Sequence, residues 1–249
     1  MLSSKQQRVR ACILVKAYPQ RSQKYEETVC AAAVSDDGQQ MLRLYSVRYR
    51  HLPQERQFER FDLIEMETER PRDDHRPESR HVVEDSIRIV EPGKQLPPAQ
   101  RMALWRRHVA TSLTALVTEE KINHRSFGIV RPDLGSVRFY SKPIAKANAD
   151  EQELTSQLFQ QQSLLEDALN RSRTRITLSA ISSRPTATGT AVRCWIGEVQ
   201  AAWFNYQRIY GDNALKIMQQ EYGERIQNLH LIFGNQHKRP WQFIVIGLL

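Results

Sequence analysis

The chain has 249 residues, with 36 Lys or Arg against 28 Asp or Glu, so its formal net charge is +8 and its isoelectric point is near 9.6. With 40% hydrophobic and 26% charged residues it can bury a core of its own, which excludes a small disulfide scaffold and a wholly disordered chain. The early apolar run at residues 11–15 is far shorter than the roughly 20 residues of a membrane span, so we expect a soluble, cytoplasmic protein with no membrane partner.

The first ninety residues predict mainly strands. Apolar runs at residues 10–17 and 27–35 are followed by the turn signal Asp36-Asp37-Gly38 and a third run at 41–47, which indicates a strand and then a β-hairpin. Residues 48–60 predict one short helix. Residues 61–69 alternate, with Ile64 and Met66 on one face and the glutamates at 65, 67 and 69 on the other.

A charged loop at residues 70–81 and a strand at 86–90 complete this part of the chain, which predicts a small, strongly bent sheet or barrel. Residues 93–98 hold Gly93 and two adjacent prolines, which favours a linker between a β-rich module at 1–95 and an α+β module at 96–249.

Three helices and two hairpins are predicted in the second module. Apolar residues at helical spacing predict helices over 99–117, 151–170 and 197–222, the last with a break at Gly211. Residues 126–130 and 136–140 flank a turn signal and predict one hairpin, and a short strand is expected at 175–178. Residues 229–233 and 241–248 predict a closing hairpin. The expected fold class is therefore α+β.

The positive charge is concentrated in the middle of the chain, where residues 101–150 carry nine basic and four acidic side chains. Of the 36 basic residues in the chain 27 are Arg, whose planar fork of donors suits phosphates and base edges. This pattern favours a surface that binds backbone phosphates of DNA or RNA, and a solvated face is the competing account. The candidate residues are Arg101, Arg106, Arg107, Lys121, Arg125, Arg131, Arg138, Lys142 and Lys146.

The tip of the closing hairpin is a second candidate. His237, Lys238, Arg239 and Trp241 bring cations and a large aromatic ring within five positions, a set that can contact a phosphate and stack a base. The alternative is a polar loop with Trp241 turned into the core.

The charged loop at residues 70–81 supplies a different hypothesis. Asp73, Asp74 and Glu78, together with His75 and His81, are groups that hold a divalent cation such as Mg²⁺ in metal-dependent nucleases. An internal, salt-bridged turn is the other interpretation of the same loop.

Searches for other chemistry are negative. Cys12, Cys30 and Cys194 show no CxxC spacing, and the chain lacks a phosphate-binding glycine loop, GxGxxG after a strand, HExxH and GxSxG. We therefore expect no metal or cofactor unless the nuclease hypothesis holds. A Ser-His-Asp arrangement stays open, because its members need no proximity in sequence.

Several short motifs resemble a group of prokaryotic proteins to which we can attach no activity. They are KAYP at residues 16–19, YEETVC at 25–30, RLY at 43–45, RPES at 76–79, FGN at 233–235, Pro240-Trp241 and Gly247. The resemblance implies relatedness and carries no site residue over. Additional Cys and His would be expected ahead of the third helix, where this chain has Cys194 alone.

These observations favour a non-enzymatic nucleic-acid-binding protein that works as a subunit of a larger bacterial complex with other protein subunits. The alternatives are a metal-dependent nuclease and a protein-interaction subunit with an acidic partner. DNA and RNA, and single and double strands, are not distinguished.

Overall fold

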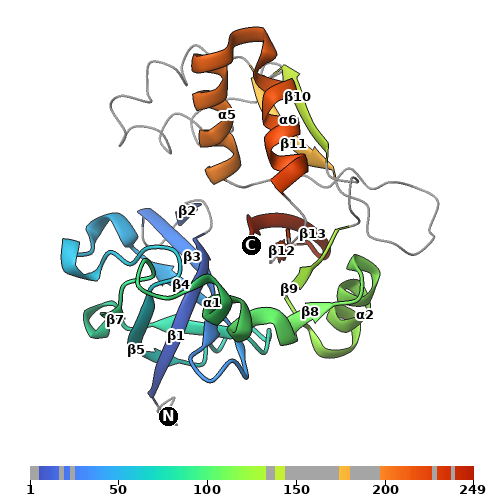
Figure 1. Ribbon diagram of the computed structural model, residues 1–249. Helices are drawn as coiled ribbons and strands as arrows, with labels where there is room; N and C mark the ends of the chain where they lie inside the picture. The colour runs from blue at the N-terminus through green and yellow to red at the C-terminus, as the bar shows by residue number, and fades with distance from the viewer. Residues whose placement is uncertain are drawn as a thin grey trace.

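The computed structural model describes residues 6–16, 20–22, 26–132, 138–143, 174–179, 197–225, 229–236 and 239–249. Strands of the N-terminal part lie at one end of the molecule, and the helices α5 (Gly197–Tyr210) and α6 (Ala214–Arg225) lie at the other (Figure 1). Among the described residues, no helix is both long and apolar enough to cross a membrane.

Five strands close into a barrel. In order around the barrel they are β1 (Gln7–Lys16), β3 (Glu26–Ser35), β4 (Met41–Val47), β6 (Ser79–Val82) and β5 (Leu63–Glu69), and β5 pairs back with β1. All these pairings are antiparallel except that of β4 with β6. Two short strands extend the sheet: β2 (Gln20–Ser22) pairs with β3, and β7 (Arg88–Glu91) pairs with β5.

The strand β1 closes the barrel because it pairs with β3 on one side and with β5 on the other. Its first part, from Gln7 to Cys12, pairs with β5, and its last part, from Ala11 to Lys16, pairs with β3. The register with β3 shifts between Ile13 and Val15, and an irregularity of this kind bends a strand sharply.

Alternation along the strands fills the barrel. Ala11 and Ile13, Ala31 and Ala33, Leu42 and Leu44, and Ile64 and Met66 form one buried cluster, in which the small alanines leave room for the larger side chains. Two 3-10 helices, η1 (Tyr49–His51) and η2 (Gln54–Arg56), connect β4 to β5, and the neighbouring Leu52 and Phe58 join the same cluster.

A second sheet packs on the outside of the barrel. Its strand order is β13 (Arg239–Leu248), β12 (Leu231–Gln236), β9 (Phe127–Val130) and β8 (Val109–Ala110). Phe127, Ile129 and Ile232 share a buried cluster with Cys12 and Val34 of the barrel. Trp105, at the end of α1 (Pro98–Trp105), belongs to this cluster too.

The helices cover the second sheet. The helix α2 (Leu113–Asn123) connects β8 to the parallel strand β9. Trp203 of α5 and Met218 of α6 are buried with Phe233 and Val245 of β12 and β13. The strands β10 (Arg138–Pro143) and β11 (Thr174–Ser179) form a separate antiparallel pair.

Much of the predicted organisation is confirmed. The fold is α+β, with a β-rich N-terminal barrel followed by a mixed region of helices and strands. The β3–β4 and β12–β13 hairpins form as expected, and the third predicted helix breaks at Gly211. The helix predicted over 151–170 lies outside the described residues.

Three local predictions are wrong. The helix expected over 99–117 ends at Trp105, because residues 109–110 pair as a strand with β9 before α2 begins. The segment 126–130 forms no hairpin with 136–140: β9 pairs with β12 and β8, and β10 pairs with β11. The charged loop ends early, since residues 79–82 form β6.

Candidate nucleic-acid interface

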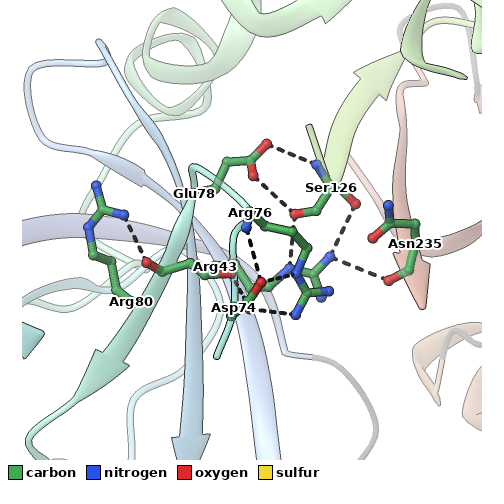
Figure 2. Close-up of polar contacts among 8 residues, drawn as sticks. Arg43, Asp74, Arg76, Glu78, Arg80, Ser126 and Asn235 are labelled. Carbon is green, nitrogen blue, oxygen red and sulfur yellow. Dashed lines mark hydrogen bonds and ion pairs between the residues drawn. The ribbon is translucent and has the colours of Figure 1, made fainter. Parts of the chain in front are cut away.

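The charged loop and the closing hairpin come together around one buried residue, Ser126, which directly precedes β9. Glu78, from the β5–β6 loop, accepts hydrogen bonds from the Ser126 backbone N–H at 3.0 Å and from its hydroxyl at 3.1 Å. Arg43 of β4 donates from Nε to the Ser126 hydroxyl and from Nη2 to its carbonyl oxygen, both at 3.1 Å (Figure 2). Ser126 therefore joins the barrel to the second sheet.

The closing hairpin reaches the same junction. Arg43 Nη2 also donates to the carbonyl oxygen of Asn235, at 3.5 Å, and Asn235 Nδ2 donates to the carbonyl oxygen of Pro240 at 2.9 Å. Burial and the neighbouring Arg76 lower the pKa of Arg43 to about 10, which leaves the guanidinium charged at neutral pH. Asn235 and, through it, Pro240 are thus held against the outer side of β4.

The β5–β6 loop, residues 70–78, is organised around Asp74. Arg76 donates from Nε and Nη2 to the two oxygens of this carboxylate, both at 2.7 Å, and the Ser79 hydroxyl donates to it at 2.6 Å. Burial raises the pKa of the Asp74 carboxyl, but the hydrogen bonds from Arg76 and Ser79 outweigh burial and lower it overall. The loop is therefore an internal, salt-bridged turn.

The proposed nuclease carboxylates therefore have partners within the chain. Asp74 binds Arg76 and Ser79, Glu78 binds Ser126, and Asp73 is exposed. His75 is exposed as well. Among the described residues no group of three or more His, Cys, Asp or Glu side chains is arranged to hold a metal ion.

Two aromatic rings lie side by side on the outer face of the barrel, next to this loop. Tyr45 of β4 is paired in register with His81 of β6, and their ring centroids are 6.0 Å apart in an edge-to-face arrangement. Both side chains are half-buried. Burial, with the nearby charges of Asp74 and Asp73, raises the pKa of Tyr45, so its hydroxyl stays protonated and able to donate.

Three of the predicted basic residues, Arg106, Arg107 and the half-buried Arg125, lie near His108, at the end of the short helix η4 (Arg106–His108). His108 Nε2 is 2.9 Å from the carbonyl oxygen of Gly38, in the β3–β4 turn. Burial lowers the pKa of His108, and the positive charges of Arg125 and Arg107 lower it further. Arg106 and Arg107 are exposed.

The remaining candidates are dispersed. Lys121 on α2 and Arg131 after β9 are exposed, whereas Arg101 is half-buried and donates to the carbonyl oxygens of Leu96 and Gly93. Arg138 and Lys142 lie on β10 and Arg239 begins β13, but their side chains are outside the described set, as are all of Lys146, His237 and Lys238. Trp241 is 64% exposed, so the alternative that buried it in the core is wrong.

The charged loop is a candidate from the sequence, whereas Arg43, Tyr45 and Ser126, which the fold brings beside it, are not. Tyr45 and His81 stand 36 positions apart and meet only through the parallel pairing of β4 with β6. Arg43 and Ser126 meet through the packing of two sheets. Neither relationship leaves a local signal in the sequence.

The strand order of the barrel, with its single parallel pair, is that of the OB fold, a five-stranded Greek-key barrel. Residues 7–111, which hold the barrel, α1 and β8, match the model of a family described as a domain of unknown function (DUF8758). No curated protein matches the chain. The expected resemblance to a group without an assigned activity is thus confirmed.

Proposed function

We propose that this protein is a non-enzymatic nucleic-acid-binding protein whose barrel takes single-stranded DNA or RNA. Barrels of this topology bind oligonucleotides on the face of their second and third strands, beside the loops that follow the first and fourth strands. Here those strands are β3 and β4, the connection after the first strand contains β2, and the loop after the fourth strand is residues 70–78. The observation that carries the proposal is the pairing of Tyr45 with His81 on this face.

Only part of the face is open. Near the β3–β4 turn its side chains are buried against the second sheet, as Val34 and Met41 are with Ile232. Farther along β4, Tyr45 and His81 are half-exposed. Aromatic rings on a strand surface stack unpaired bases whatever their identity, and this contact is unavailable to bases inside a duplex.

Basic residues lie near the aromatic pair. Arg70 is exposed on the β5–β6 loop, and the half-buried Arg125 directly precedes Ser126. Exposed arginines around a stacking surface displace condensed counterions from the phosphates of a bound strand. Trp241, exposed one residue beyond Pro240, adds a second aromatic surface next to the junction.

The proposal is tested by removing the rings. Replacing both Tyr45→Ser and His81→Ser removes the stacking surface while leaving the junction at Ser126 intact. Stacking contributes roughly 1–3 kcal/mol per base, so a single-stranded oligonucleotide should bind about 10-fold more weakly or worse in a polarisation assay. The matched control is Tyr210→Ser, which removes an exposed tyrosine at the far end of α5.

Each alternative has its own outcome in the same assay. Equal affinities of the wild type and the double variant would remove the barrel face from the binding site. Cleavage that requires Mg²⁺ or Mn²⁺ would favour a nuclease. Failure of the wild type to bind any nucleic acid at low salt would favour an acidic protein partner.

A further inference from the structure

Arg80 is a nearly buried cation that the junction does not use. It follows Ser79 on β6, and because strand residues alternate, its side chain lies on the opposite side from Ser79 and His81. Figure 2 shows it separated by the strand from the Asp74–Arg76 pair. Its relative exposure is 8%, at the end of the barrel where the β5–β6 loop meets β6.

In the described part of the chain, only one of the three guanidinium nitrogens of Arg80 makes hydrogen bonds. Nη1 donates to the carbonyl oxygens of Pro77 at 2.9 Å and Ser79 at 2.8 Å. Within the described part of the chain, Nε and Nη2 have no hydrogen-bond partner, and no carboxylate lies within ion-pair distance. Nε and Nη2 of Arg80 are both accessible to solvent, because neither is one of the fully buried nitrogens that lack a hydrogen-bond partner.

The surroundings leave this charge uncompensated. Burial lowers the pKa of Arg80, and the nearby positive charge of Arg70 lowers it further. Glu78 is the carboxylate that opposes this effect, but its own oxygens accept hydrogen bonds from Ser126. A buried guanidinium without an anionic partner is unfavourable, and an anion bound at its free edge removes that cost.

We infer that Arg80 binds a phosphate group through its free Nε and Nη2 edge, with Arg70 as the second cation. That edge presents two parallel N–H donors, the geometry in which a guanidinium binds two oxygens of one phosphate. A purely structural role, in which Arg80 holds the β5–β6 loop in place, explains the two hydrogen bonds of Nη1. It does not explain why Nε and Nη2 are left without partners. This assignment rests on the proposed function: because Arg80 lies on the other side of β6 from His81, the phosphate is one that the bound strand carries past the end of the barrel.

The first experiment measures the anion site without nucleic acid. The midpoint temperature of unfolding of the full chain is compared in inorganic phosphate, in pyrophosphate and in chloride at equal ionic strength. Phosphate at about ten times its dissociation constant should raise the wild-type midpoint by roughly 2–5 °C over chloride. Arg80→Gln should abolish the difference, and Arg88→Gln, at an exposed arginine on β7, should preserve it.

A second variant covers the case in which Arg80→Gln does not fold. Arg70 is exposed and makes no hydrogen bond in the described chain, so Arg70→Gln leaves the fold intact and should weaken the phosphate effect. An equal phosphate effect in the wild type and in both variants, or no effect in the wild type, would overturn the site.

The second experiment identifies the source of the phosphate. The slope of log affinity against log salt for a single-stranded oligonucleotide should fall by about 0.7 in Arg80→Gln, the value that corresponds to one phosphate. An unchanged slope in a variant that no longer responds to phosphate would assign the site to a free anion. If the wild type binds no oligonucleotide but gains stability from phosphate through Arg80, the proposed function fails and the anion site stands.

Discussion

Glu78 and Ser126 are joined by two hydrogen bonds, so the loop between β5 and β6 is fastened to the start of β9. The two residues are separated by 48 positions, and both are buried. Because Arg43 donates to the same serine hydroxyl, one side chain holds a carboxylate and a guanidinium at once. This contact couples the face that we assign to nucleic acid to the second sheet.

Ser126→Ala tests the coupling. It removes one hydrogen bond from each of Glu78 and Arg43, which keep their contacts with the backbone of residue 126, and hydrogen bonds to charged groups contribute on the order of 1–3 kcal/mol. We expect a loss of free energy of unfolding of this size in urea titrations. Thr118→Ala, at an exposed position of α2, is the control and should change stability by less than about 0.5 kcal/mol. Equal stabilities of the two variants would contradict the coupling.

Gly93 is a second position where the packing makes a definite prediction. A Cβ added there would lie 2.5 Å from the backbone carbon of Phe61 and 2.6 Å from the carbonyl oxygen of Arg60. Backbone atoms cannot move aside cheaply, so Gly93→Ala should destabilise the protein by about 1–3 kcal/mol or more. At Gly211, φ is +53° and the space is open, so Gly211→Ala should cost only about 1 kcal/mol. Thermal unfolding that ranks the two variants in the reverse order would refute this account.

The Asp74–Arg76 pair predicts a dependence of stability on acid. The pKa of Asp74 is lower in the folded protein than the value near 3.9 of an unfolded chain, so its contribution is complete above that value. The contribution is lost as the pH falls below about 4, toward the folded pKa. Asp74→Asn should therefore show a shallower loss of unfolding free energy between about pH 5 and pH 2, in denaturant titrations at each pH. Parallel curves for the two proteins would show that Asp74 is not responsible.

The basic residues predict a salt effect. Replacing Arg106, Arg107, Arg138 and Lys142 together by Gln should weaken binding to a single strand and flatten its salt dependence, by about 0.7 in slope for each phosphate that is no longer neutralised. Arg106 and Arg107 are exposed, so their replacement should leave the unfolding temperature unchanged. An unchanged slope would remove this set from the interface.

The β-rich character of the first ninety residues could be predicted because alternation is a local signal. Ile64 and Met66 do point into the barrel, while Glu67 is exposed. Closure of the barrel could not be predicted, because it depends on pairing β1 with β5 across more than fifty positions. For the same reason β9 was expected in a local hairpin, whereas its partner β12 begins about a hundred residues later.

The candidate site shows the same division. Charge clustering in the sequence located the loop at 70–81 and the basic segments. It could not show that Asp74 and Glu78 are occupied by Arg76 and Ser126, or that Tyr45 lies beside His81. Gly93, expected in a linker, is buried and donates its backbone N–H to Asp62 at 2.6 Å, because tertiary packing fixes a segment that composition alone would leave open.

Binding of a single strand by the barrel is tested most directly by the affinity of the intact protein for DNA and RNA. Polarisation titrations should use single-stranded and double-stranded DNA and RNA of one sequence, at several salt concentrations, with and without Mg²⁺. We expect salt-dependent binding that is tighter for a single strand than for its duplex, with no cleavage. A protein that binds no strand at low salt, or that prefers the duplex, would contradict this expectation.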